Sequence, residues 1–181
     1  MPLWDFSTPA GITTCVDMCD KDIGGFSDAQ MEYVPKSETD PAHMRFSGTI
    51  SNRLPPNEVD VERTGYAAWR TQDRPSTLFG KTLWDVDRYE YLALHVKTDG
   101  RKYKVNLQTE SLVYTDIHQH RLYAKHPGHW ETILIRWNDF VRTNHGIVVE
   151  PQSEINKEKV RTIGVGSVSY THLTLPTKRI V

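Results

Sequence analysis

Residues 91–108 decide the fold class, and they read YLALHVKTDGRKYKVNLQ. Apolar residues recur at every second position on both sides of an Asp-Gly pair. They are Leu92, Leu94 and Val96 in the first run and Tyr103, Val105 and Leu107 in the second. Alternation with period two is typical of strands that bury one face, and Asp-Gly tolerates the positive φ of a tight turn. The stretch therefore predicts two strands paired as an antiparallel hairpin.

The rest of the chain has the same character. Further strand-like segments are residues 43–50, 65–71, 130–137 and 160–165. Turn-forming clusters such as 52–57 and 73–76 separate them, and only 137–141 resembles a brief helical turn, which Asn138 or Asp139 would cap. Many short strands, hardly any helix and no internal repeat predict an all-β jelly-roll β-sandwich.

Length and charge limit the class of protein. The chain has 181 residues, which suits one domain with its own core. Its 22 Lys and Arg stand against 23 Asp and Glu, a net charge of -1, so it lacks the basic footprint of an electrostatic nucleic-acid binder. No apolar run approaches the roughly 20 residues of a membrane helix. Acids outnumber bases over residues 1–40, unlike a mitochondrial transit peptide.

The two cysteines, Cys15 and Cys19, lie four residues apart in a strand-like segment. A strand would separate them by roughly 13 Å, too far for a disulfide between them. Two thiolates are also only half of a structural zinc site. We therefore expect free, buried or half-buried thiols, which suit a reducing compartment.

The most metal-like feature is the group His118, His120, His126 and His129. On a strand, His118 and His120 would point to one face about 6.6 Å apart, which suits shared ligation. However, residues 121–125 offer no carboxylate, and His126 and His129 flank a Pro-Gly turn. We therefore expect hydrogen-bonded or solvent-facing histidines and no metal.

Catalytic patterns are not recognisable elsewhere. Asp85 and Asp87 lie beside Trp84, and Glu131 opens a strand, but sugar hydrolysis needs two carboxylates that face each other across a cleft. The glycine pairs are not followed by a phosphate-binding helix, and no serine occupies a nucleophile elbow. The sequence favours a protein that is not an enzyme and has no cofactor.

Five tryptophans leave two classes of binding protein open. They are Trp4, Trp69, Trp84, Trp130 and Trp137. In a jelly roll such side chains either fill the core, which is the default, or line a concave face that stacks on sugar rings. A protein-interaction module would bury them, whereas a carbohydrate-binding module would expose aromatic and polar groups together.

Short motifs follow one another in a distinctive order between residues 4 and 166. They are WDF at 4–6, DIGGFS at 22–27, FSGTI at 46–50, GYAAWR at 65–70, LAL at 92–94, DGR at 99–101, NLQT at 106–109, QHRL at 119–122, WE at 130–131, WNDF at 137–140 and KVRTIG at 159–164. Each alone is weak, but this order resembles the complex I intermediate-associated protein 30 family, whose members are mitochondrial assembly factors for respiratory complex I.

The resemblance implies a galactose-binding-like jelly roll that acts without catalysis, as a chaperone-type factor. Its implied partners are complex I assembly intermediates and other assembly factors, and its implied location is the mitochondrial matrix or inner membrane. The motif positions that would be structural or partner-binding are Asp22, Gly24, Gly25, Ser27, Arg70, Arg101, Gln119, His120, Trp137 and Asp139. The glycines suit a tight loop, and the two arginines are hydrogen-bonding anchors.

The end of the chain departs from the family pattern. After residue 166 the resemblance implies a glycine-rich loop and a last hydrophobic strand, but residues 168–181 read VSYTHLTLPTKRIV, like a translated sequencing-library adapter. We therefore expect a domain at residues 1–166, a non-native tail at 167–181 and a missing last strand. Its loss would leave backbone groups unpaired and the core partly uncovered, which lowers stability.

Overall fold

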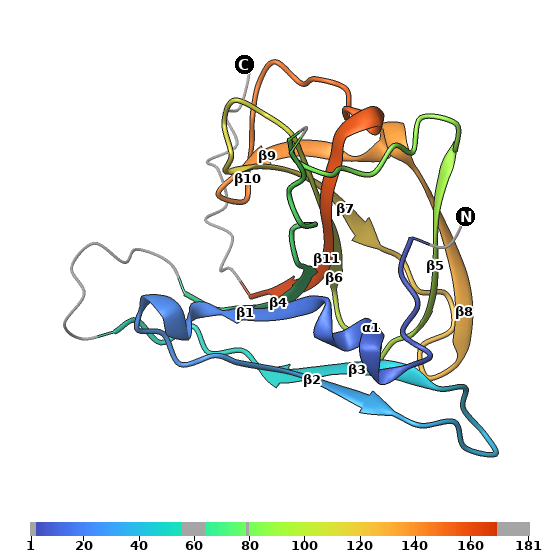
Figure 1. The fold of residues 1–181 in the computed structure, drawn as a ribbon. Helices are drawn as coiled ribbons and strands as arrows, with labels where there is room; N and C mark the ends of the chain where they lie inside the picture. Colours follow the sequence, from blue (N-terminus) through green and yellow to red (C-terminus); the bar gives the residue numbers. More distant parts are fainter. Residues whose placement is uncertain (1–2, 56–63, 79, 170–181) are drawn as a thin grey trace, which may run out of the picture.

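Strands dominate the computed structural model, which describes residues 3–55, 64–78 and 80–169 (Figure 1). The strands are β1 (Cys15–Cys19), β2 (Asp28–Val34), β3 (His43–Thr49), β4 (Tyr66–Thr71), β5 (Tyr91–Lys97), β6 (Tyr103–Thr109), β7 (Asp116–Leu122), β8 (Trp130–Arg136), β9 (Val141–Asn144), β10 (Ile147–Val148) and β11 (Val160–Val168). The helical elements are α1 (Pro9–Thr13) and the 3-10 turns η1 (Asp20–Ile23), η2 (Trp137–Asp139) and η3 (Lys157–Lys159). The predicted all-β class is confirmed.

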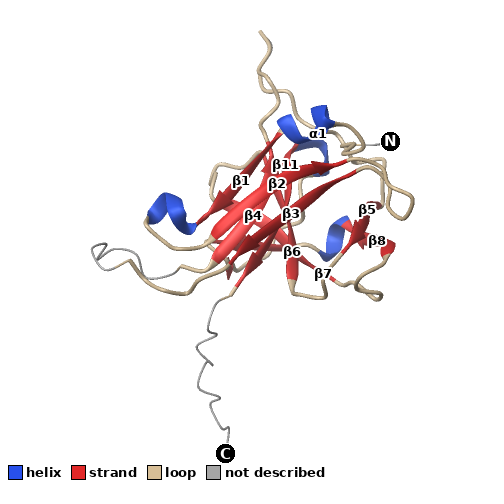
Figure 2. Ribbon diagram, turned by 90° about the horizontal axis from the view of Figure 1, so that it is seen from below, coloured by secondary structure: helices blue, strands red, loops and turns tan. Residues whose placement is uncertain are grey.

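The strands form two layers. One layer is an antiparallel seven-stranded sheet in the order β1-β4-β11-β6-β7-β9-β10. The other consists of two separate two-stranded ribbons, β2–β3 and β5–β8. Figure 2 shows β2 and β3 lying over β1 and β4, with β5 and β8 at one side. The first layer is therefore continuous, and the second is divided.

The core lies between the seven-stranded sheet and the β5–β8 ribbon. Val105 and Leu107 of β6 are 0% and 1% exposed, and Ile163 of β11 is the cross-strand neighbour of Leu107. Leu92 of β5 and Ile135 of β8 belong to the same buried cluster. Burying each side chain of this size contributes about 1.5–3 kcal/mol, so the alternating residues of 91–108 hold the layers together.

The hairpin predicted from Asp99-Gly100 is wrong. β5 pairs with β8, whereas β6 pairs with β7 and β11, so residues 98–102 cross from one layer to the other. Gly100 does adopt a positive φ of 84°. Asp99 Oδ1 accepts hydrogen bonds from the Arg101 amide and the Tyr103 hydroxyl, both at 3.0 Å. Crossing lets the two apolar strand faces meet across the core, whereas a hairpin would place them side by side in one layer.

The other local predictions have mixed outcomes. Strands β3, β4, β8 and β11 coincide with predicted segments, but β2, β9 and β10 were not among them. The short helical turn is η2, yet its N-cap is Arg136 and no side chain caps it, so the capping role of Asn138 or Asp139 is wrong. Both cysteines lie on β1 as free thiols, as predicted, with Cys15 buried.

The two ribbons of the second layer are bridged at one end by side chains. Asp40 Oδ1 accepts hydrogen bonds from Lys97 Nζ and Trp130 Nε1, both at 2.8 Å. Trp130 in turn stacks on His95, with 5.2 Å between ring centroids. These contacts join the loop before β3 to the paired ends of β5 and β8.

A cavity of about 1250 Å³ separates the ribbons beyond this bridge. Residues 42–46 of the β3 region, residues 91–97 of β5 and the N-terminal residues 3–7 line it. Within the described chain, β3 pairs only with β2 and β5 only with β8. β3 and β5 therefore each have one edge that no other described strand pairs with. Residues 170–181 of the predicted tail lie outside the described residues, so the boundary at 166 stays a prediction.

Candidate functional site

Two predicted site residues, Arg70 and Gln119, lie on the outer face of the seven-stranded sheet. The strand register places side chains in rows across this face. One row is Arg70, Gly164, Asn106 and Gln119, and the next is Ala68, Gly166, Lys104 and Arg121. These positions alternate with core residues such as Val105 and Ile163. The sheet therefore brings together residues from β4, β11, β6 and β7.

The polar groups of this face are linked by hydrogen bonds. Gln119 Nε2 donates to Asn106 Oδ1 at 2.8 Å, and Lys104 Nζ donates to Gln119 Oε1 at 3.3 Å. Arg70 Nη1 donates to the Thr71 carbonyl at 3.0 Å. Amide side chains both donate and accept, so the row presents ready-made hydrogen-bonding groups to a ligand.

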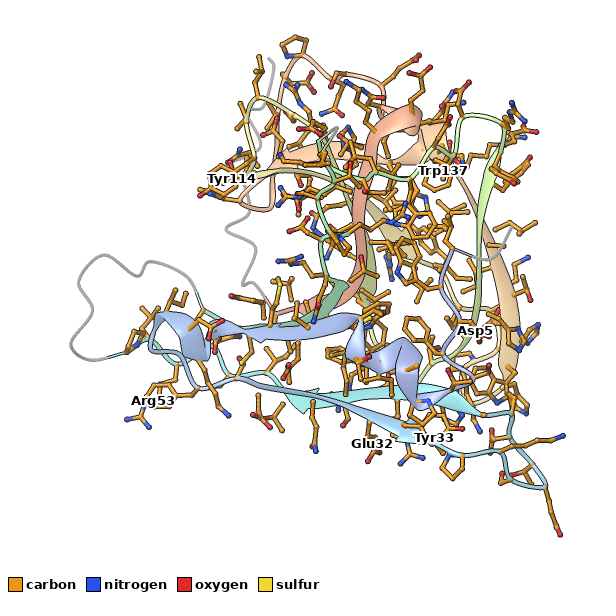
Figure 3. All side chains as sticks on the ribbon, in the orientation of Figure 1. Asp5, Glu32, Tyr33, Arg53, Tyr114 and Trp137 are labelled. Carbon is orange, nitrogen blue, oxygen red and sulfur yellow. The ribbon has the colours of Figure 1, made fainter. Side chains whose placement is uncertain are left out.

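Glycines form the floor of this face. A Cβ at Gly164 would lie 2.2 Å from the Trp69 carbonyl oxygen, and one at Gly166 would lie 2.8 Å from the Ala68 Cβ. A groove of about 580 Å³ lies over these glycines. Its lining includes Asn106 and Gln119 together with Tyr66 and Tyr114. Figure 3 shows Tyr114 and Trp137 on opposite sides of β11. The groove is thus separate from the core.

The predicted loop at residues 22–27 surrounds a carboxylate that the motif did not include, Asp20. This side chain is fully buried. It accepts hydrogen bonds from the Ser27 amide at 2.7 Å, the Ser27 hydroxyl at 2.8 Å and the Gly65 amide at 2.5 Å. Burial opposes its ionisation, but these hydrogen bonds outweigh burial and hold the pKa of Asp20 below its usual range.

The glycines of the motif are explained by the same contact. Gly24 has a φ of 81°, which side chains rarely adopt, and a Cβ at Gly25 would lie 2.4 Å from the Asp20 carboxylate. Ser27 is also buried and accepts a hydrogen bond from the Ser51 amide at 3.0 Å. Asp22 is exposed. The hydrogen bonds of Asp20 and Ser27 therefore connect η1, the residues after β3 and the residue before β4.

The remaining predicted residues are dispersed. His120 and Trp137 both face Phe140 in the core, with ring centroids 5.6 and 6.3 Å away. Arg101 and Asp139 are exposed, in the β5–β6 connection and in η2. The predicted residues therefore do not form one site.

His118 and His120 share one face of β7, as predicted, and that face is turned to the core. His118 is buried, so the expectation of a solvent-facing ring is wrong for this residue. Among the described residues, no group of three or more His, Cys, Asp or Glu side chains is placed to hold a metal ion. No helix in the described part of the chain is long and apolar enough to cross a membrane. The groove on the outer face brings Arg70 and Gln119 together with Asn106 and Lys104, and it is the candidate functional site.

Sequence comparison connects this fold to known proteins. A family model described as "Complex I intermediate-associated protein 30 (CIA30)" matches residues 4–172. A protein of that name from Neurospora crassa, "mitochondrial" in its description, is 48% identical over 178 residues, which cover 88% of this chain. A Drosophila melanogaster protein of the same description is 33% identical and covers 58% of this chain. The matches span 64% of the Neurospora protein and 36% of the Drosophila one.

Structural comparison supports the fold. A family 11 carbohydrate-binding module from Clostridium thermocellum, solved with a β-1,3-1,4-mixed-linked tetrasaccharide, superimposes with a TM-score of 0.59. The match covers 88% of this chain and 82% of that one, at 13% sequence identity. At this identity the likeness concerns the fold alone, and it confirms the predicted jelly-roll β-sandwich.

Proposed function

Because this chain belongs to the complex I intermediate-associated protein 30 family, we propose that it takes part in the assembly of mitochondrial complex I. It acts by binding protein partners, namely assembly intermediates and other assembly factors, and makes or breaks no covalent bond. Its place of action is the mitochondrial matrix or the inner membrane, with which it would be associated. The match to residues 4–172 is the observation that carries this proposal.

The positions of the tryptophans support a protein-binding role. Trp137 is 3% exposed, and the other four are partly buried. Trp4 contacts Trp84 at 5.1 Å between ring centroids, and Trp69 contacts Phe6 at 5.4 Å. None of the tryptophans is a free platform for a sugar ring, because each is used in packing or, in the case of Trp130, in the Asp40 bridge.

Affinity capture tests the proposal. The chain is tagged, joined to the import segment of the Neurospora relative and expressed in Neurospora crassa at the level of that relative. We expect complex I subunits to be enriched over a tagged, unrelated mitochondrial protein of equal abundance. Equal recovery of complex I subunits with both baits contradicts the proposal.

Carbohydrate binding is the second candidate. The observation that favours it is the groove, where Tyr66 and Tyr114 lie near the amides of Asn106 and Gln119. A glycan array that includes β-1,3-1,4-mixed-linked tetrasaccharide decides between the two. Retention on a glycan, together with failure of the capture experiment, favours the carbohydrate module.

A further inference from the structure

We propose that the outer face of the seven-stranded sheet is a docking site for an extended, acidic segment of a protein partner. This inference rests on the proposed function and adds to it a surface and the chemistry of the partner. Three observations support it: the positive charge of this face, two cations in directly opposite positions on neighbouring strands, and glycines that leave the middle of the face without side chains.

The face is cationic in a chain that is slightly acidic overall. Its outward-facing positions on β4, β11, β6 and β7 are Tyr66, Ala68, Arg70, Thr162, Gly164, Gly166, Val168, Lys104, Asn106, Gln108, Ile117, Gln119 and Arg121. Three of these side chains are cations and none is a carboxylate, which gives +3, whereas the whole chain carries -1. A ligand with negative charge is therefore the complementary one.

Two of the cations face each other directly. Lys104 of β6 and Arg121 of β7 are cross-strand neighbours in the register. Like charges in directly opposite positions of an antiparallel pair destabilise the sheet. Among the described residues, no carboxylate lies within ion-pair distance of either side chain, and Arg121 lies over the Tyr123 ring at 5.0 Å. Repulsion between Lys104 and Arg121 therefore lowers the stability of the isolated protein, and a bound carboxylate would offset this repulsion.

Nearby carboxylates are already engaged elsewhere. Asp73 lies 4.0 Å from Arg70 Nη1, but it accepts two hydrogen bonds from Arg161. Those hydrogen bonds lower the pKa of Asp73 and keep it ionised beside Arg161. Asp116 of β7 accepts a hydrogen bond from Asn144 at 2.7 Å and points to the other side of that strand. Lys104 and Arg121 thus remain open to a carboxylate of a partner, whereas Arg70 lies beside Asp73.

The shape of the groove suits a polypeptide in extended conformation. Gly164 and Gly166 leave the floor without side chains, so a peptide backbone can approach the sheet closely. Asn106 and Gln119 supply donors and acceptors that match peptide groups. The four strands span roughly 14 Å, the length of about four extended residues, at the usual spacing of neighbouring strands.

A labelled peptide tests the proposal. The probe is a fluorescein-labelled dodecapeptide of alternating Glu and Ser, and its binding is followed by fluorescence anisotropy at low salt. The test variant is K104Q with R121Q, and the charge-matched control is R45Q with K36Q, on the opposite layer. We expect the test variant to bind the probe about tenfold more weakly, because two charge contacts are lost, and the control to bind within about twofold of the original chain.

Further readouts exclude a structural explanation. Removing the opposed cations should leave the unfolding midpoint unchanged or raise it, because a repulsion is relieved. Should this pair of substitutions prevent folding, R70Q alone is the substitute. A peptide of alternating Lys and Ser should not bind. Equal binding of the acidic probe by the test variant, no binding by the original chain, or displacement only by the mixed-linked tetrasaccharide overturns the proposal.

The capture experiment separates this inference from the proposed function. If K104Q with R121Q recovers as much complex I as the original chain does, the surface is wrong and the assembly role stands. If the original chain recovers no complex I subunits, the assembly role is wrong. The peptide-binding experiment alone then decides whether the outer face is a docking site.

Discussion

Asp20 holds three separate segments of the chain together with a charged side chain that solvent does not reach. Its substitution by Ala leaves the amides of Ser27 and Gly65 buried without acceptors. We predict that D20A lowers the free energy of unfolding by about 3–5 kcal/mol, since hydrogen bonds to a charged group are worth about 1.5–3 kcal/mol each. Urea unfolding followed by tryptophan fluorescence measures this.

The neighbouring carboxylate supplies the control for that prediction. Asp22 lies in the same 3-10 turn but is exposed, so D22A should change stability by less than about 0.5 kcal/mol. Comparable losses in D20A and D22A would show that the loop, and not the buried carboxylate, determines stability.

His118 makes the stability of the protein depend on pH. Burial lowers its pKa and Arg142 nearby lowers it further, and together they outweigh the Ser153 backbone and the Asp116 carboxylate, which raise it. The unfolded state therefore binds a proton more readily than the folded state does. The neutral His118 ring makes its full contribution to the free energy of unfolding above about pH 6.5, the pKa of histidine in the unfolded chain. This contribution declines as the pH falls below that value.

We predict that H118Q unfolds with a flatter pH dependence between about pH 6.5 and 5 than the original chain, whereas H126Q, at an exposed position, retains the original slope. Denaturant midpoints measured across this range test the prediction. The carboxylates Asp20 and Asp73 have lowered pKa values, so their contributions to stability are lost only at more acidic pH. Their titration therefore does not overlap with the pH range in which His118 affects stability. An unchanged slope in H118Q would rule out this assignment.

At the scale of elements, the division of the second layer is the most consequential feature. β3 and β5 line one cavity, and among the described strands each has an edge without a pairing partner. The chain leaves β11 close to the end of β3, where Asn52 Nδ2 donates to Ser169 Oγ at 3.3 Å. A last strand, as expected from the family pattern, would run along β3 from this end before it reaches the cavity at residues 42–46. Its amides would pair with exposed strand edges and its apolar side would cover the core.

We predict that replacing residues 170–181 by the segment that follows the matched region in the Neurospora relative raises the unfolding midpoint by about 5 °C or more, which corresponds to roughly 1–2 kcal/mol for a domain of this size. Hydrogen exchange should slow at amides of β3 and β5. The control is the same segment with prolines at alternate positions, which cannot complete a ladder. No gain in either measurement would speak against a strand in the gap.

The sequence predicted the strands well and their pairing poorly. Alternation is a local signal, so residues 91–97 and 103–108 were identified within a residue of β5 and β6. The Asp-Gly pair gave the correct turn geometry at Gly100. However, the choice of partner strand depends on which apolar faces meet across the core, and contacts with distant β8 and β11 decided it. Local pattern does not contain that information.

The site was predictable in part for the same reason. The motif order marked Arg70 and Gln119 but did not place them on one face, because that requires the register of four strands. Lys104 and Arg121 were missed, although a signal was present: the polar faces of residues 104–108 and 117–121 contain cations and no acid. Asp20 was missed because its burial follows from a contact with Gly65, 45 positions away in the chain.

At the scale of the whole molecule, the fold separates its two faces by role. One side of the seven-stranded sheet is used for the core, and the other presents the polar groove. Family membership and the 48% identity to the Neurospora protein support the proposed role in complex I assembly.

Complementation in Neurospora crassa is the most direct test of this account. In a strain that lacks the relative, the matched region of the relative is replaced by this chain, and assembled complex I is measured by native gel electrophoresis with NADH oxidation staining. The account predicts that mature complex I returns with the original chain and is reduced with K104Q and R121Q. A chain that is imported, folded and abundant, yet leaves complex I unassembled, would contradict it.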